Sequence, residues 1–289
     1  MQQNQQSLIF LHIAVLMFGG TALFSKLISL SALDITVYRT AIAFATLWLL
    51  LTLQRKAILL NRGKDYLIAL LLGAVVGLHW VTYFAGMQLA GVATGIIAFF
   101  TYPVITVFLE PLFAKSKPQR KDIISAAVVI TGIYLLVPEA NLGNDVTLGI
   151  LSGVVSGALF ALRNILQKRY FATYSGPHAM LYQTCIAALL LAGFVSAPPS
   201  QVESHNWQLL LLAGVVFTAL PHALFAHALR HLSATTAGLI SCLQPLYGTL
   251  LAFMLLAERP NWQTLVGGLL VVSAALYETW SIARKTAKS

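Results

Sequence analysis

The sequence predicts an all-α polytopic membrane protein with ten transmembrane helices, arranged as two inverted five-helix repeats. Of its 289 residues, 58% are hydrophobic and only 9% are charged, whereas a soluble domain carries about 25% charged residues. The apolar residues form long runs, and about 20 helical residues are needed to cross the hydrocarbon core of a bilayer. A shift of 142 residues places Pro103 on Pro245 and Pro118 on Pro260, which indicates an internal repeat.

Short polar breaks separate the apolar runs and set the limits of each expected helix. Turn-forming residues follow the second span at 61–63, divide the two halves at 141–144, and follow the seventh span at 197–200. We expect a first repeat over residues 1–140 and a second, inverted repeat over residues 141–289. The predicted spans, in chain order, lie near residues 8–30, 35–53, 65–86, 91–114, 122–137, 147–167, 178–196, 208–230, 234–256 and 262–283.

The distribution of basic residues predicts which loops face the cytoplasm. If the N-terminus is inside, the inner loops and the C-terminal tail hold fourteen Lys and Arg residues, and the outer loops hold only Arg259. Loops rich in Lys and Arg stay on the cytoplasmic side. We therefore predict a multi-pass protein of the plasma membrane, the inner membrane of a bacterium, with both termini in the cytoplasm. Contact with lipid headgroups accounts for the net charge of +9, so no nucleic-acid partner is expected.

Matching residues occur in the earlier part of each half as well. Gly20 precedes Lys26 by six residues, as Gly157 precedes Arg163, and the triplet 38–40 resembles the triplet 182–184. Because each half has five crossings, the second half begins on the opposite side of the membrane. Inverted repeats of this kind give many transporters their inward-open and outward-open states.

These features resemble the ten-helix drug/metabolite transporter superfamily, and within it the EamA-like permeases, over nearly the whole chain. The segments that carry the resemblance are Phe18-Gly19-Gly20 with Lys26, then Arg39, the run from His79-Trp80 through Tyr83-Phe84 to Tyr102-Pro103, Gln244-Pro245, and Glu258-Arg259. One departure is Ser116-Lys117, where the family commonly has a Glu after the proline-bearing helix of the first half.

The resemblance implies a secondary-active transporter, not an enzyme, that exports small amphipathic metabolites such as amino acids by alternating access. It also implies a central cavity built by all helices except the fifth and the tenth. An uptake permease, a channel-like facilitator and an intramembrane enzyme are the alternatives, although the sequence lacks the H-E-x-x-H and G-x-S-x-G patterns of the last class. The expected partners are a small-molecule substrate and the lipid bilayer, with the chain a monomer or a homodimer. No cofactor or metal is expected.

Aromatic and polar side chains near the middle of the spans form the expected substrate site. His79 and Tyr83 share one face of the third span, and polar groups on aromatic bodies suit a cavity for amphipathic solutes. His79 has a second interpretation, as a core histidine that hydrogen-bonds to a neighbouring helix. The expected substrate-binding residues are His79, Trp80, Tyr83, Phe99, Tyr102, Tyr182, Gln183, Gln244 and Tyr247.

Three residues are expected to act in gating or as hinges: Arg39, Pro103 and Pro245. Each proline lies near the middle of a predicted span, where it removes one backbone donor and frees the carbonyl four residues earlier. A freed carbonyl, such as that of Phe99, can bind substrate where transporters use irregular helix. The hinge and the carbonyl site are therefore two interpretations of the same prolines.

Basic residues inside predicted spans are candidates for function because burying their charge in lipid is costly. Arg39 lies one turn inside the second span, about 6 Å from the outer boundary by helix rise. It can attract a substrate carboxylate or pair with Asp34 at an outer gate. Lys26 and Arg163 lie near span ends, and we expect both to extend toward the interface.

Small residues recur along the sixth span at Gly149, Gly153 and Gly157. Such a stripe lets two helix backbones approach closely. We expect it to pack inside the bundle, with a dimer interface as the alternative.

Overall fold

The computed structural model describes all residues except 1, 115–119, 138–142, 229–231, 233–239 and 287–289. The described residues form helices joined by short connections. In chain order the α-helices are α1 (Gln2–Thr21), α2 (Phe24–Leu27), α3 (Ala32–Leu53), α4 (Gly63–Ala90), α5 (Val92–Phe99), α6 (Tyr102–Ala114), α7 (Arg120–Leu136), α8 (Asp145–Tyr170), α9 (Gly176–Leu191), α10 (Ser204–Gly214), α11 (Leu220–Ala228), α13 (Gln244–Leu256) and α14 (Trp262–Thr286). Two 3₁₀ turns, η1 (Ala192–Phe194) and η2 (Pro199–Gln201), and one π-helical turn, η3 (Val215–Ala219), lie between them.

Seven helical stretches of the described chain are long and apolar enough to cross a membrane. Three shorter apolar helices, Ile123–Leu136, Gln244–Leu256 and Trp262–Tyr277, fall where the fifth, ninth and tenth spans are predicted. The count of ten spans stays a prediction, because residues 234–239 of the ninth predicted span lie outside the described residues.

The surface of the bundle is apolar, as a lipid-facing surface should be. Leu67 is 70% exposed, Leu112 75% and Leu269 67%. A soluble monomer does not carry so much apolar side chain on several faces at once. Within lipid, helices satisfy their own backbone hydrogen bonds, which is why the chain crosses the membrane as helices.

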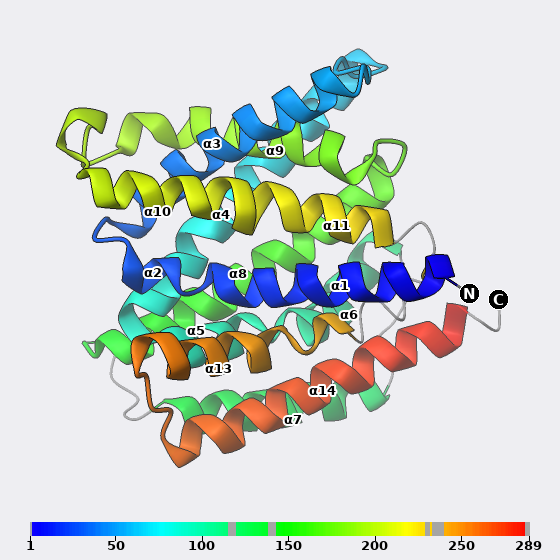
Figure 1. Cartoon of the computed structure of the whole chain (residues 1–289). Helices are drawn as coiled ribbons and strands as arrows, with labels where there is room; N and C mark the ends of the chain where they lie inside the picture. The colour runs from blue at the N-terminus through cyan, green and yellow to red at the C-terminus, as the bar shows by residue number, and fades with distance from the viewer. Residues whose placement is uncertain (1, 115–119, 138–142, 229–231, 233–239, 287–289) are drawn as a thin grey trace.

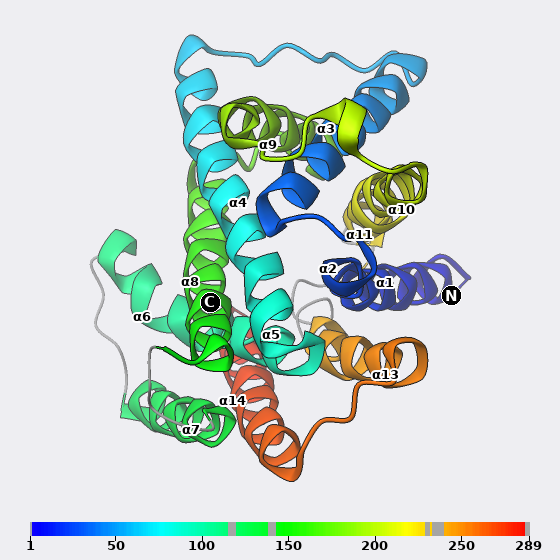
Figure 2. The same cartoon turned by 90° about the vertical axis from the view of Figure 1, so that its left-hand side faces the viewer.

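The long helices run side by side, and the first turns of α1 and the last turns of α14 lie at the same end of the bundle (Figure 1). Viewed along the helices, α7 and α14 lie together at one edge, α3 and α9 lie toward the opposite edge, and α4 and α8 lie between them (Figure 2). This arrangement places α7 and α14, the fifth and tenth predicted spans, at one edge of the bundle (Figure 2).

Close packing of α8 against α4 and α5 depends on the glycine stripe. A Cβ added at Gly149 would lie 2.6 Å from the Ala90 nitrogen, and one at Gly153 would lie 2.7 Å from the Ala98 Cβ. A Cβ at Gly157 would lie 2.7 Å from the carbonyl oxygen of Phe99. The structure confirms that this stripe packs inside the bundle.

The predicted fourth span is not one continuous helix. The helix α5 ends at Phe99, residues 100 and 101 form a turn, and α6 begins at Tyr102 with Pro103 as its second residue. Proline is tolerated at the start of a helix, where its missing N–H would have no partner in any case. The second half repeats the pattern, with a turn at residues 242 and 243 and Pro245 at the start of α13. The structure therefore places each proline just after a break in its predicted span, and the hinge and the freed carbonyl both stay predictions.

Glu258 connects the end of α13 to the start of α5. Its carboxylate accepts hydrogen bonds from the backbone nitrogens of Val92 at 2.8 Å and Ala93 at 3.2 Å. A negative charge is favourable at a helix N-terminus. Gly91 has φ of +88° just before this helix, and a Cβ there would lie 2.9 Å from a Glu258 carboxylate oxygen. The matching position in the first half, Ser116, lies outside the described residues.

Candidate functional site

Arg39 lies at the centre of the candidate site, on α3 and only 1% exposed. Its guanidinium carbon lies 4.7 Å from the ring centroid of Trp80 and 4.8 Å from that of Phe84. Nη1 donates a hydrogen bond to the Thr218 hydroxyl at 3.2 Å. Nε and Nη2 are buried without a hydrogen-bond partner in the described part of the chain. The group is thus held by aromatic faces and one hydroxyl, while one of its edges has no acceptor.

The π-helical turn η3 brings Thr218 to Arg39. The Thr218 hydroxyl donates to the Ala213 carbonyl, five residues earlier, at 2.7 Å, and its oxygen receives the arginine. The Phe217 carbonyl, also in this turn, accepts from the Thr21 hydroxyl at 3.0 Å. π-helical turns occur frequently at functional sites. The sequence analysis missed Thr218, because nothing in a local apolar run marks a single π-helical turn.

Asp34 does not pair with Arg39. Its carboxylate accepts hydrogen bonds from the Ser31 hydroxyl at 2.8 Å and from the nitrogen and hydroxyl of Ser196 at 2.9 and 2.7 Å. The outer gate pair considered for Arg39 and Asp34 is therefore absent from this structure, because Asp34, in the first turn of α3, is bound by the N-cap residue Ser31 and by Ser196 in the loop after η1.

His79 connects α4 to α8. The Ser156 hydroxyl donates to the His79 carbonyl at 3.0 Å, and His79 Nδ1 lies 2.8 Å from the same hydroxyl and 3.1 Å from the Ser156 carbonyl. Since the serine proton is already used, we assign the proton of this contact to Nδ1, which leaves Nε2 as an acceptor in the neutral ring. The contact matches the interpretation of His79 as a histidine bonded to a neighbouring helix.

An aromatic cluster surrounds His79, and it draws on four helices. Phe99 and Tyr102 are stacked with their centroids 5.3 Å apart, and Phe160 lies 5.0 Å from both Tyr102 and His79. Tyr83 lies 5.2 Å from Phe99. We call His79, Tyr83, Phe99, Tyr102 and Phe160 the aromatic cluster. Phe160 is a member that the sequence analysis missed, because a phenylalanine in an apolar helix resembles any other lipid-facing or core residue.

Tyr83 and Gln244 meet at the border between this cluster and Arg39. The Tyr83 hydroxyl is buried without a hydrogen bond of normal geometry among the described residues, although the Gln244 side chain lies within reach of it. Because Gln244 begins α13, the contact brings the start of that helix to the centre of the bundle.

Arg163 is held inside the bundle and does not extend toward the interface, which corrects the expectation from its position. Its Nε donates to the Gln183 side-chain oxygen at 2.8 Å, Nη1 to the Asn164 oxygen at 3.0 Å, and Nη2 contacts the Met180 sulfur at 3.3 Å. Gln183, which is fully buried, donates in turn to the Gln167 side chain at 2.9 Å. The Gln183 amide oxygen accepts a hydrogen bond that lipid chains cannot provide, so the charge of Arg163 stays within the protein.

The two guanidinium groups lie around one centre. Arg39 packs on Trp80 and Arg163 contacts the Met180 sulfur, and Trp80 and Met180 belong to one cluster of buried side chains. Within the described residues, neither guanidinium has a carboxylate partner at ion-pairing distance. The centre of the bundle therefore carries positive charge that no described acidic side chain balances.

Two expected site residues lie elsewhere. The Tyr182 hydroxyl donates to the Ile58 carbonyl at 3.0 Å and its ring lies beside that of Tyr66. Consecutive residues point about 100° apart on a helix, so Gln183 facing the centre turns Tyr182 away. The Tyr247 hydroxyl contacts His12 Nδ1 at 3.2 Å, and its ring packs beside α1. Lys26, by contrast, extends outward as expected and donates to the Gln88 carbonyl at 2.7 Å.

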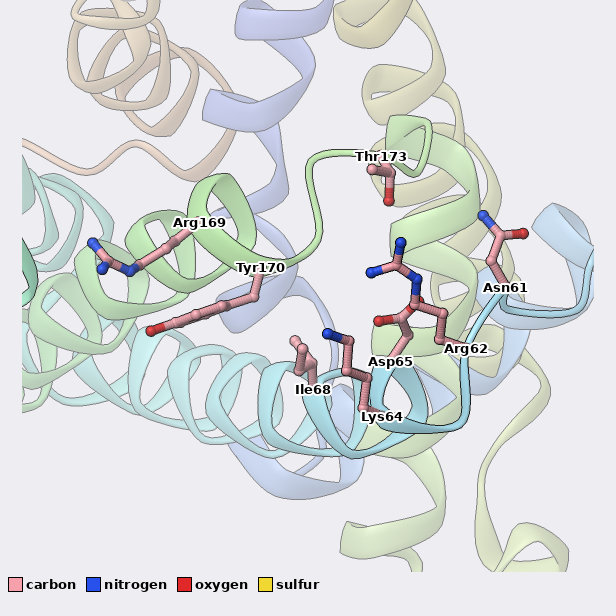
Figure 3. A pocket seen from close by; sticks show the side chains of 8 residues that line it. All are labelled: Asn61, Arg62, Lys64, Asp65, Ile68, Arg169, Tyr170 and Thr173. Atoms are coloured by element: carbon pink, nitrogen blue, oxygen red, sulfur yellow. The ribbon is translucent and has the colours of Figure 1, made fainter.

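A separate pocket of about 460 Å³ lies between the start of α4 and the end of α8 (Figure 3). It is lined by Asn61, Arg62, Lys64, Asp65, Ile68, Arg169, Tyr170 and Thr173. The Asp65 carboxylate is already bound by the Tyr174 hydroxyl at 2.6 Å. Basic side chains at helix ends are typical of a surface that meets lipid headgroups, and this pocket lies apart from Arg39 and the aromatic cluster.

A chain of many apolar helices, whose charged and aromatic side chains meet inside the bundle, belongs to the class of multi-span membrane proteins. Comparison with known proteins then gives the family. The model of the EamA-like transporter family matches residues 5–137 and, separately, residues 147–278. The chain therefore belongs to the EamA-like transporter family, which confirms the resemblance. Because this is a family of transporters, the protein is a membrane transporter and not an enzyme.

Individual relatives agree with this assignment. An uncharacterized transporter of Archaeoglobus fulgidus is 27% identical over 197 residues, 68% of this chain and 70% of the relative. The uncharacterized transporter YojE of Bacillus subtilis is 24% identical over 84% of this chain and 83% of the relative. The pseudopaline exporter CntI of Pseudomonas aeruginosa is 25% identical over 86% of both chains. A solved crystal structure covers 99% of both chains with a TM-score of 0.65 at 15% identity, which shows a shared fold.

Proposed function

We propose that this protein is a secondary-active transporter that exports small amphipathic metabolites, such as amino acids, by alternating access. Two inverted five-helix repeats, residues 1–140 and 141–289, rock against each other around the central site. The protein lies in a bacterial inner membrane with both termini in the cytoplasm, as its loop charges predict.

The observation that carries the proposal is that the central contacts join the two proposed repeats. Arg39 of the first repeat bonds to Thr218 of the second at 3.2 Å, and His79 of the first bonds to Ser156 of the second at 2.8 Å. Rocking of one repeat against the other changes such contacts. A substrate bound among them is then exposed to one side of the membrane at a time.

Two further observations support the repeats. The family model matches each half of the chain separately. The helices also break at corresponding places, at residues 100–101 and 242–243, and each break is followed by a helix with proline at its second position. Irregular helix near the middle of a span is where transporters place their substrate sites.

The substrate site that we propose consists of Arg39, Trp80, the aromatic cluster, Gln183 and Gln244. Trp80 is 7% exposed and lies under the Arg39 guanidinium. Tyr182 and Tyr247 are left out, because their hydroxyls bond to groups outside the centre. Aromatic walls with a few placed polar groups are typical of sites for amphipathic small molecules.

The proposal is tested by metabolite profiling of cells and growth medium. Three strains produce equal amounts of the unaltered protein, a Trp80→Ala, Tyr102→Ala double variant, or a Trp262→Ala control. Trp262 is 64% exposed at the start of α14, so its removal changes aromatic content without touching the site. We expect a small set of compounds to accumulate outside with the unaltered protein and the control, but not with the double variant.

Other outcomes separate the alternatives. Accumulation of the same compounds inside the cells would establish an uptake permease. Single-channel currents from purified protein in a planar bilayer would establish a channel-like facilitator. Equal export by the double variant and the control would refute the placement of the site.

A further inference from the structure

The two unpartnered nitrogens of Arg39 lie on one edge of its guanidinium group. Nη1 is bonded to Thr218, which leaves Nε and Nη2 buried without an acceptor among the described residues. An N–H on each of these two nitrogens points to the same side of the planar group. That edge forms two parallel hydrogen bonds to both oxygens of a carboxylate.

The Tyr83 hydroxyl is a further buried donor, on the helix whose rings flank the Arg39 guanidinium. It is buried without a hydrogen bond of normal geometry among the described residues, and the Gln244 side chain lies within reach of it. Trp80 and Phe84, whose rings flank the guanidinium, lie on α4 three residues before and one residue after Tyr83. This spacing places all three rings on the side of α4 that faces Arg39.

We propose that the substrate carries a carboxylate group, and that Arg39 binds this group through Nε and Nη2 with Tyr83 as an additional donor. The proposal rests on the transporter function proposed above, because a group that is 1% exposed is reached only when the bundle opens. A carboxylate is an acceptor with no donors of its own, so it suits a site where three donors lack acceptors. The described residues supply no acidic side chain that takes this place.

The surroundings also indicate what the rest of the substrate contains. Tyr83 belongs to the aromatic cluster and lies 5.2 Å from Phe99, which is stacked on Tyr102. A molecule held by its carboxylate at Arg39 therefore extends along aromatic rings. We assign the substrate to carboxylates with an apolar or aromatic body.

A carboxylate is favoured over a phosphate by the number of free donors. Arg163, the other guanidinium of the centre, already has a partner for Nε, Nη1 and Nη2. Around Arg39, the buried polar atoms without a hydrogen bond of normal geometry among the described residues are therefore Nε and Nη2 of Arg39 and the Tyr83 hydroxyl. A phosphate dianion has three strong acceptor oxygens and two negative charges to satisfy.

The test compares probes of one shape and different charge on the purified full chain. Binding of 3-phenylpropionate, its uncharged amide 3-phenylpropionamide, the cation 3-phenylpropylamine and phenyl phosphate is measured by thermal stabilisation over a concentration series. We expect 3-phenylpropionate to bind at least about tenfold more tightly than the amide, as a charged bidentate pair allows. The amine should bind more weakly than the amide.

Variants test whether the preference for the carboxylate over the amide depends on Arg39. In Arg39→Gln the carboxylate and the amide should bind within about twofold of each other, whereas Lys26→Gln should keep the full preference. Lys26 is the matched control, because its ammonium bonds to the Gln88 carbonyl away from the centre. Tyr83→Phe removes only the third donor and should reduce the preference severalfold, so the proposal stays testable even if Arg39→Gln does not fold.

Several outcomes would overturn the inference. These are equal binding of carboxylate and amide, absence of binding for every probe, a preference that persists in Arg39→Gln, or tighter binding of phenyl phosphate. Failure here is distinct from failure of the proposed function. A protein that exports metabolites without preferring carboxylates overturns only this inference, whereas one that prefers carboxylates but moves no compound overturns only the transport proposal.

Discussion

Replacing the two central arginines by methionine should have unequal effects on stability. In Arg39→Met, two buried N–H groups without partners are removed, and each costs about 1 to 3 kcal/mol in the folded state. The change also removes one charged hydrogen bond, which contributes about 1.5 to 3 kcal/mol, and two cation–π contacts of about 0.5 to 2 kcal/mol each. These opposing contributions are of similar size, so the net change should be small.

The neighbours of Arg39 support this estimate. The Thr218 hydroxyl keeps its own hydrogen bond to Ala213 after the arginine is removed, so no buried donor is stranded. Methionine fills much of the same volume between the rings of Trp80 and Phe84.

Arg163→Met has no such compensation. Each nitrogen of Arg163 has a partner, and two of these partners are side-chain amide oxygens. Because the residue is only half-buried, we take about 1.5 kcal/mol for each of these two bonds, the lower end of the range for charged groups. The change also leaves the side-chain oxygen of Gln183, which is fully buried, without the hydrogen bond that Arg163 donates to it. We expect a loss of about 3 kcal/mol or more, or a fall in melting temperature of roughly 6 °C or more at about 2 °C per kcal/mol.

The assay is thermal unfolding of the purified variants in one detergent, followed by tryptophan fluorescence. We expect Arg39→Met to unfold within a few degrees of the unaltered protein and Arg163→Met to unfold clearly earlier. An equal, large loss of stability in both variants would refute the argument, because it would show that Arg39 is held as firmly by its surroundings as Arg163. The carboxylate site proposed for Arg39 would then lose its main support.

Three further predictions concern packing, capping and the helix breaks. Gly153→Leu should leave little folded protein after solubilisation, since even a Cβ would lie 2.7 Å from a side chain on the neighbouring helix. The measurement is size-exclusion chromatography, and the control is Gly193→Leu, which should give the profile of the unaltered protein because the space around Gly193 is open. Glu258→Gln should lower the melting temperature by a few degrees, since a carboxylate at a helix N-terminus contributes about 0.3 to 2 kcal/mol; an unchanged value would show that the cap is dispensable. Pro103→Ala and Pro245→Ala should slow exchange of a substrate in proteoliposomes more than they weaken its binding, and the reverse result would favour the freed carbonyls over a hinge.

The sequence by itself determined that the chain is a membrane protein built of many apolar helices. Composition and the length of the apolar runs are local properties, and lipid leaves helices as the available structure for them. The prediction of close packing by Gly149, Gly153 and Gly157 also came from spacing alone, since a stripe of small residues on one helix face has few other uses. The motif resemblance was likewise sufficient to identify the family.

Which side chains share the central site was decided only by the tertiary structure. Arg39 and Thr218 are 179 residues apart, and their contact depends on a π-helical turn that no local pattern marks. Arg163 faces inward because Gln183 of another helix accepts a hydrogen bond from it. Tyr182 faces outward because it precedes Gln183 on the same helix and so points about 100° away from it. A polar residue in an apolar helix has one position in the sequence but several faces available to it, and only the neighbouring helices determine which face it takes.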